Sequence, residues 1–279
     1  MKQLFAVLGD PIGHSMSPMM HNDLFSFYDI DAHYLPFHVK AENLEDAVKG
    51  LKAIGVAGFN VTIPHKSTII SFLDEVDELA MRIGAVNTVV NDEGRLKGYN
   101  TDGLGFLTGL QAHVPSITGH NILIIGAGGA ARAIYFTLAK NEPKQVDIAN
   151  RTLATAVRLV KDCPFPPPSK AISLEDASRN LGEYDIIIQT TMIGMAPEIS
   201  KQPIPLTNLN SQSIVCDIIY NPLETQFLQE AKRMGARFQN GLDMFVYQGA
   251  HAFERWTGIF PDVERMRKNV LEQLGGKLC

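Results

Sequence analysis

Short apolar runs alternate with segments of helical periodicity along the first part of the chain. Apolar runs predict strands at residues 4–8, 33–39 and 58–62, and helical spacing of apolar positions predicts helices over residues 19–28, 41–53 and 74–83. Ser17-Pro18 precedes the first helix, with a hydroxyl at the expected N-cap and proline in the first turn. Residues 86–90 and 95–99 flank Asn91-Asp92-Glu93-Gly94, which predicts a β-hairpin. The first part of the chain is therefore predicted to form an α/β domain.

From Ile122 onward the strand-like runs are mostly continuous rather than alternating. They lie at residues 122–125, 146–149, 186–188 and 214–218, and helical patterns follow the first two at 130–139 and 152–160. Continuous apolar strands that alternate with helices predict a parallel sheet covered on both faces, the doubly wound arrangement. Residues 241–274 are again helical in pattern and carry an apolar face.

Composition narrows the class of protein without naming a function. The 279 residues suffice for one large or two medium domains, and the formal net charge of -5 argues against binding to nucleic acid or to an anionic membrane. The apolar runs are shorter than the ~20 residues of a membrane-spanning helix, and the N-terminus lacks the apolar core of a signal peptide. Cys163, Cys216 and Cys279 form no disulfide or metal-binding pattern. We therefore expect a cytoplasmic protein without a metal site or a membrane partner.

A glycine-rich turn follows the apolar strand at 122–125 and opens a helix. Its spacing is Gly126-x-Gly128-x-x-Ala131, and the predicted ligand contacts lie at Gly126, Ala127, Gly128, Gly129 and Ala130. In such a turn the first glycine permits the bend, the second lets the backbone approach a pyrophosphate, and the small third residue packs helix against sheet. The amides at the helix N-terminus favour the negative charge. The turn therefore predicts a dinucleotide site.

The next strand ends at Asn150-Arg151-Thr152, where an NAD site usually carries an acidic residue for the ribose 2'-hydroxyl. No carboxylate is present there, and Arg151 supplies a permanent positive charge that suits a 2'-phosphate. Asn150, Arg151 and Thr152 therefore predict NADP rather than NAD as the cofactor.

Polar residues cluster at loops of the first part of the chain. The run Asn60-Val61-Thr62-Ile63-Pro64-His65-Lys66 is followed by Asn87 and by Asn100-Thr101-Asp102. Ketone reduction needs a proton at the oxygen as hydride reaches the carbon, and carbinol oxidation needs a base. Lys66 can fill either role, with the Asp102 carboxylate positioning it and binding a substrate hydroxyl. We therefore predict redox chemistry at a carbinol carbon, with Lys66 and Asp102 as the catalytic residues.

These motifs together resemble the shikimate dehydrogenase family, from Leu8 to Gly258. The resemblance implies NADP-dependent, reversible reduction of 3-dehydroshikimate to shikimate, with Lys66 and Asp102 handling the proton. It implies that the substrate is bound by Ser15, Ser17, Asn60, Thr62, Asn87, Tyr220 and Gln248. It also implies cofactor contacts at Met192 and Gly241. In this family Asn-Ala-Thr is more usual where this chain has Gln189-Thr190-Thr191.

The resemblance also implies a domain organisation. Residues 1–102 and 241–279 are predicted to form an α/β substrate domain, to which the C-terminal helices return, and residues 103–240 a Rossmann-type NADP-binding domain. Oligomeric state is left open between monomer and homodimer. Two other functions stay open: an NAD-dependent quinate/shikimate dehydrogenase, and a non-catalytic dinucleotide-sensing protein.

Overall fold

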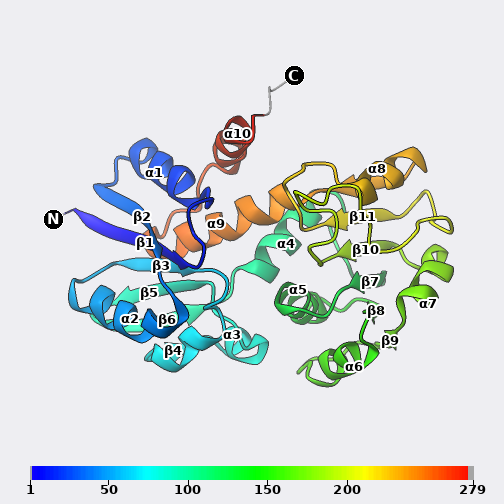
Figure 1. Ribbon diagram of the computed structural model, residues 1–279, viewed down its shortest axis with the longest axis horizontal. Coiled ribbons are helices and arrows are strands. Elements are labelled where there is room, and N and C mark those ends of the chain that lie inside the picture. The colour runs from blue at the N-terminus through cyan, green and yellow to red at the C-terminus, as the bar shows by residue number, and fades with distance from the viewer. Residues whose placement is uncertain (1, 276–279) are drawn as a thin grey trace. The chain divides into compact units, whose positions relative to one another are not determined.

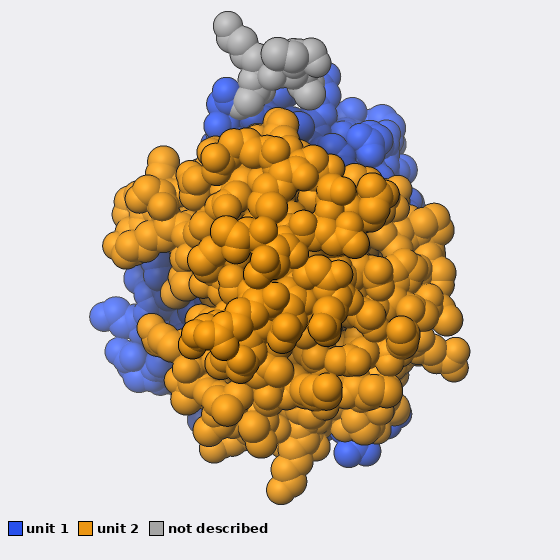
Figure 2. All heavy atoms as spheres, turned by 90° about the vertical axis from the view of Figure 1, so that its right-hand side faces the viewer, with its two compact units in different colours: residues 1–101, 246–279 blue, residues 102–245 orange. Residues whose placement is uncertain are grey.

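The structure is a computed structural model that describes residues 2–275 (Figure 1). The chain divides into two compact units, coloured separately in Figure 2: residues 1–101 with 246–279, and residues 102–245. These boundaries lie a few residues from the predicted domain boundaries. The predicted roles of the two domains stay predictions.

The first unit is built on a six-stranded mixed sheet with the strand order β2-β1-β3-β5-β6-β4. Its strands are β1 (Gln3–Gly9), β2 (Ala32–His38), β3 (Gly58–Val61), β4 (Glu75–Val76), β5 (Thr88–Asp92) and β6 (Arg95–Tyr99). β1 pairs in parallel with β2 and β3, whereas β5 and β6 form the predicted hairpin and β5 runs antiparallel to β3. The carboxyl ends of β1 and β3 therefore lie at the same edge of the sheet.

Helices cover both faces of this sheet. Successive side chains of β1 point to opposite faces and therefore contact different helices. Its helical segments are α1 (Ser17–Phe27), η1 (Ala41–Asn43), α2 (Leu44–Ala53), η2 (Thr68–Phe72), α3 (Glu78–Ile83), α10 (Val263–Gln273) and the later part of α9 (Gly241–Thr257). Phe5 stacks on Phe25 of α1 and lies 5.1 Å from Trp256 of α9. Its neighbour Ala6 points the other way, into an apolar core with Val48 of α2. Figure 1 shows α1 and α2 on opposite sides of the sheet.

The predicted helix over 74–83 is wrong in its first half. Asp74 accepts a hydrogen bond from Leu96 N at 2.7 Å, and β4 then adds to β6 as a short parallel strand. The helix α3 begins only after Asp77, whose carboxylate accepts from Leu79 N at 3.0 Å. An acidic N-cap at this position satisfies the first free amides and fixes the helix start there.

The second unit contains a six-stranded sheet with the strand order β12-β11-β10-β7-β8-β9, and every pairing in it is parallel. Its strands are β7 (Asn121–Ile125), β8 (Gln145–Ala149), β9 (Ala171–Ile172), β10 (Ile186–Gln189), β11 (Ile214–Asp217) and β12 (Arg237–Gln239). The predicted doubly wound parallel sheet is therefore confirmed. The strand order reverses between β7 and β10, which is where such folds bind their ligands.

Helices pack on both faces of the second sheet. They are α4 (Asp102–Gln111), α5 (Gly129–Ala139), α6 (Leu153–Lys161), α7 (Leu174–Arg179), η3 (Leu181–Glu183) and α8 (Gln226–Arg233). Ala177 of α7 and Phe227 of α8 share one core with Leu123 and Val215 of the sheet. The sequence did not predict α4, whose glycines obscure its pattern, nor the short strands β9 and β12.

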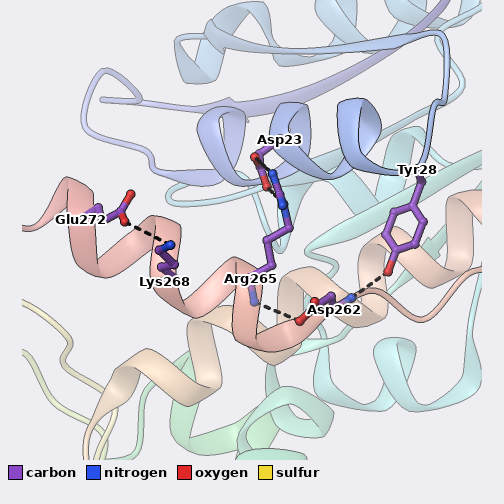
Figure 3. Close-up of polar contacts among 6 residues, drawn as sticks. All are labelled: Asp23, Tyr28, Asp262, Arg265, Lys268 and Glu272. Carbon is purple, nitrogen blue, oxygen red and sulfur yellow. Dashed lines mark hydrogen bonds and ion pairs between the residues drawn. The ribbon is translucent and has the colours of Figure 1, made fainter. Parts of the chain in front are cut away.

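The C-terminal segment forms two helices rather than one continuous pattern. The helix α9 ends before Gly258, which has φ +75°, and α10 starts at the N-cap Asp262. Trp256 of α9 donates to Val89 O of β5 at 3.0 Å, and α10 docks on α1 through Arg265 and Asp23 (Figure 3). The predicted return of the C-terminal helices to the first domain is confirmed.

Candidate active site

The loop after β3 presents Thr62 and Lys66, and the sheet fixes its path. Thr62 N donates to Leu8 O at 2.9 Å, and Val86 N donates to Lys66 O at 2.7 Å. His65 is buried and its Nε2 lies 2.6 Å from Val39 O, so its ring anchors the loop. Lys66 is half-buried. The histidine therefore has a structural contact, while the lysine is held at the surface of the first unit.

Two of the predicted substrate residues lie in one buried hydrogen-bond network. Asn60 Nδ2 donates to Asn87 O at 3.0 Å and to Thr88 Oγ1 at 3.1 Å. Asn87 Oδ1 accepts from Thr101 N at 2.8 Å, and Asn87 Nδ2 donates to Thr101 Oγ1 at 3.0 Å. The structure thus brings together Asn60 of β3 and Asn87, the residue before β5. Thr88 was not among the predicted site residues, and Thr101 was named only as part of the Asn100-Thr101-Asp102 motif, without a predicted contact.

Ser17 does not cap α1, so that prediction is wrong. The N-cap is Met16, no side chain caps the helix, and Ser17 is already its first residue. Ser17 is buried, and its side chain lies against the phenol of Tyr34 instead. Its backbone amide faces Ser15 Oγ at 3.4 Å, so the serine pair lies together at the start of α1.

The remaining substrate and catalytic residues are divided between the units. Gln248 is half-buried on the part of α9 that belongs to the first unit. Asp102 is buried at the start of α4 and opens the second unit. Tyr220 follows β11, its ring lies 5.0 Å from that of Phe245, and burial raises the pKa of its phenol. The pairing of Lys66 with Asp102 stays a prediction.

The turn between β7 and α5 has the geometry that phosphate binding needs. Gly126 has φ +113°, and a Cβ there would lie 2.5 Å from Thr190 Oγ1, so only glycine fits. A Cβ on Gly128 or Gly129 would meet nothing within 4 Å, so the backbone borders open space. No side chain caps the N-terminus of α5, whose amides therefore remain available to an anion. These features fit a dinucleotide pyrophosphate.

The residues after β8 also fit a 2'-phosphate. Asn150 Nδ2 donates to Thr152 O at 2.9 Å, which closes a short turn around the exposed Arg151. The helix α6 then begins at Leu153. Residues 150–152 contain no carboxylate that would repel a phosphate, and the arginine is free to turn toward one.

Neither a metal centre nor a membrane span is evident in the described part of the chain. Within residues 2–275, no cluster of three or more His, Cys, Asp or Glu side chains could hold a metal ion. Over the same residues, no helix has both the length and the hydropathy to cross a bilayer. Cys163 and Cys216 are buried free thiols, and Cys279 lies outside the described residues.

Family models match three consecutive parts of the chain. They describe a shikimate dehydrogenase substrate binding domain at residues 7–89, a shikimate/quinate 5-dehydrogenase at 109–218, and a shikimate 5'-dehydrogenase C-terminal domain at 241–271. The chain is also 56% identical over 277 residues to shikimate dehydrogenase (NADP(+)) of Bacillus cereus, covering 99% of this chain and 100% of that protein.

The chain belongs to the shikimate dehydrogenase family.

Solved structures of the family agree with the observed fold. A shikimate dehydrogenase in complex with NADP+ superposes with a TM-score of 0.91 at 42% identity, covering 98% of this chain and 96% of that one. Quinate dehydrogenase from Corynebacterium glutamicum in complex with NAD also superposes with a TM-score of 0.91, but at 27% identity, covering 97% and 99%. The fold is therefore shared by a shikimate dehydrogenase bound to NADP+ and a quinate dehydrogenase bound to NAD.

Gln189, where the family resemblance predicted an asparagine, is fully buried and has well-defined partners. Its Nε2 donates to Thr191 O at 3.1 Å and to Ile193 O at 3.0 Å, and its Oε1 accepts from Thr191 N at 2.6 Å. These bonds tie down the loop that carries Met192, a predicted cofactor contact that is 73% exposed. The longer side chain therefore orders this loop instead of leaving a polar group without a partner.

Gly241 has a packing role whatever it contacts in a complex. A Cβ at this position would lie 2.1 Å from Ile218 O, and its amide donates to Ile219 O at 2.9 Å. Only glycine allows α9 to start this close to the end of β11. The predicted cofactor contacts at Gly241 and Met192 stay predictions.

Proposed function

We propose that this protein is an NADP-dependent shikimate dehydrogenase that reduces 3-dehydroshikimate to shikimate and catalyses the reverse oxidation. The observation that carries the proposal is the full-length 56% identity to a protein of that name. The buried Asn60–Asn87 network offers polar groups for the substrate hydroxyls. The glycine turn offers backbone amides for the cofactor phosphates.

In the proposed mechanism, the residues of this chain hold the substrate and move one proton. Lys66 gives a proton to the carbonyl oxygen during reduction and takes it back during oxidation, and Asp102 holds the ammonium and a substrate hydroxyl. Substrate is bound by the carboxylate-binding pair Ser15 and Ser17 and by Asn60, Thr62, Asn87, Tyr220 and Gln248. Exclusion of water from the reacting carbon protects the transferred hydride.

NADP supplies or accepts the hydride when it is bound. We assign its pyrophosphate to the backbone of Gly126, Ala127, Gly128, Gly129 and Ala130, and its 2'-phosphate to Arg151 with Asn150 and Thr152. Met192 and Gly241 complete the proposed set. These assignments are supported by the open space at Gly128 and Gly129 and by the uncapped start of α5.

The domain roles, compartment and assembly are also proposals. Residues 1–102 with 241–279 bind substrate, and residues 103–240 bind NADP. The protein is a cytoplasmic monomer or homodimer, and light scattering coupled to gel filtration decides between these two states.

A spectrophotometric assay tests the function directly. The purified protein is given shikimate or quinate with NADP or NAD, and formation of reduced nicotinamide is followed. We expect the highest kcat/KM for shikimate with NADP. A clear preference for quinate with NAD would favour the quinate dehydrogenase alternative. Nucleotide binding without turnover of either substrate would favour a dinucleotide sensor.

A further inference from the structure

Tyr34 of β2 connects two residues of the proposed substrate site, although it was not among the predicted site residues. Its side chain is fully buried, and its phenol oxygen lies 2.6 Å from Asn60 Oδ1. The Ser17 side chain lies against the same phenol. One buried hydroxyl therefore touches a residue from the start of α1 and another from β3.

The surrounding partners determine which way the Asn60 carboxamide points. The backbone carbonyl of Asn87 can only accept a hydrogen bond, so the Asn60 atom that lies 3.0 Å from it must be the amide nitrogen. The second amide hydrogen goes to Thr88 Oγ1 at 3.1 Å, and Thr88 gives its own proton to Asn87 Oδ1 at 3.0 Å. Both amide hydrogens of Asn60 are therefore used within the protein. Asn60 Oδ1 faces Tyr34, which must donate to it.

The Ser17 side chain lies against the same phenol, whose proton is directed at Asn60. A ligand that reaches Asn60, which is 7% exposed, finds only the second lone pair of Oδ1.

We propose that Tyr34 is a positioning residue for shikimate, whose phenol holds Asn60 so that this side chain can only accept a hydrogen bond from a substrate hydroxyl. The inference rests on the proposed function, because it assigns the sense of one contact in that site. A substrate hydroxyl that donates a hydrogen bond to Asn60 Oδ1 is bound. A substrate group that can only accept is not bound there, because Asn60 Oδ1 is itself an acceptor.

The fold holds Tyr34 firmly enough for this role. Its ring stacks on His21 at 4.7 Å and lies 6.0 Å from Trp256. Its backbone exchanges two bonds with the Asn22 side chain, at 2.8 and 2.9 Å. Tyr34→Phe keeps all of these contacts and removes only the hydroxyl, so it isolates the phenol's effect on Asn60.

The first test is the steady-state kinetics of Tyr34→Phe. We expect the KM for shikimate to rise roughly five- to tenfold, because one buried hydrogen bond is lost. The kcat and the KM for NADP should change less than about twofold. The matched control is Tyr135→Phe in the second unit, where an equally buried phenol donates to Ser169 Oγ at 2.9 Å. The control should leave all three constants unchanged. An unchanged shikimate KM in folded Tyr34→Phe would overturn the proposal.

A double-mutant cycle shows whether Tyr34 acts through Asn60. In an Asn60→Ala background, we expect Tyr34→Phe to raise the shikimate KM by less than about twofold. If the double variant's shikimate KM rises by the full product of the two single effects, Tyr34 does not act through Asn60 and the proposal is wrong.

A third measurement needs no Tyr34 variant and therefore decides the matter even if Tyr34→Phe does not fold. Shikimate analogues with one ring hydroxyl at a time replaced by fluorine, which cannot donate, are compared for binding. One analogue should lose roughly tenfold in affinity for the unaltered protein and little for Asn60→Ala. If no analogue shows this difference, the proposal fails. If the unaltered protein turns over no shikimate at all, the proposed function fails, and the inference fails with it.

Discussion

At the scale of single residues, the buried His21 is costly for the protein to ionise. The side chain is fully buried, and neither ring nitrogen has a hydrogen-bond partner. The rings of Tyr34, Phe253 and Trp256 surround it, and burial lowers the pKa of His21 to about 3. Stacking on aromatic rings favours a cation by only ~2 kcal/mol, whereas removing a charge from water costs several, so the neutral form wins.

His21 should therefore make the folded state sensitive to acid. Its pKa is about 3 when folded and ~6.5 when unfolded, so its contribution to stability is complete above pH ~6.5 and is lost as pH falls toward about 3. Between pH ~7 and ~5 this loss is about 2 kcal/mol of the free energy of unfolding. Denaturant titrations of His21→Leu at the two pH values should show a decrease in the free energy of unfolding that is smaller than the parent protein's decrease by that amount. Comparison with the parent protein cancels other groups, including Asp217, whose pKa burial raises to about 7.

The control for this prediction is His33→Gln, because His33 is exposed on β2. Its pH dependence should match that of the parent protein. If His21→Leu showed the parent's full acid sensitivity, desolvation of His21 would not be its source.

Cofactor choice is also decided at single residues. Arg151→Ala should raise the KM for NADP far more than that for NAD, because a charge-assisted bond to the 2'-phosphate contributes ~1.5–3 kcal/mol, or roughly ten- to over a hundredfold. Arg158→Ala, an exposed arginine on the adjoining helix α6, is the matched control and should change neither constant. Equal changes for both cofactors in Arg151→Ala would remove that residue from phosphate binding.

At the scale of elements, a forked ion pair is one of the contacts that dock α10 on α1 (Figure 3). Arg265 donates to both carboxylate oxygens of Asp23, at 2.5 and 2.7 Å, and its guanidinium lies 4.5 Å from the centre of the Phe27 ring. Asp262 N donates to the Tyr28 hydroxyl at 2.9 Å. The hydrogen bond from Arg265 lowers the pKa of Asp23, so the pair is lost only as pH falls through the carboxylate's own range.

Removing this pair should loosen α10 more than the rest of the protein. Because both side chains are partly exposed, water screens the pair, and Arg265→Ala should destabilise the docking of α10 only modestly. Hydrogen exchange of the α10 amides should then be faster by roughly fivefold. Lys268→Ala is the control, since Lys268 pairs with Glu272 within the same helix at 3.9 Å. Equal effects of the two variants would mean that the fork to Asp23 does not hold α10.

At the scale of the whole molecule, local patterns predicted most of the fold. Continuous apolar runs predicted the parallel strands β7, β8, β10 and β11, because burial on both faces leaves no room for polar alternation. Two-residue strands such as β4 and β9 are too short to carry a period, and their pairing depends on partners distant in sequence. The capping role of Ser17 was misjudged for a related reason, because its side chain lies against Tyr34 across the fold.

The same distinction applies to the candidate site. The glycine turn could be predicted, because the positive φ at Gly126 is a local requirement for glycine that is visible in the spacing of the motif. The roles of Tyr34, Thr88 and Thr101 could not, because they arise only where separate strands meet. Local chemistry is thus predictable from sequence, whereas the contacts that orient it are properties of the assembled molecule.

The proposed catalytic roles of Lys66 and Asp102 can be tested by kinetics. Lys66→Ala removes the proposed proton donor, and such groups contribute typically ~10²–10⁴-fold, so kcat should fall by that order while NADP affinity hardly changes. Asp102→Asn keeps the size of the side chain but loses its charge, and should also lower kcat strongly. If the two residues act as one unit, the double variant should lose much less than the product of the single effects. A substrate deuterium isotope effect establishes that hydride transfer limits the rate in each variant. Near-normal kcat in Lys66→Ala under that condition would exclude Lys66 from proton transfer, because the step being measured would then proceed without it.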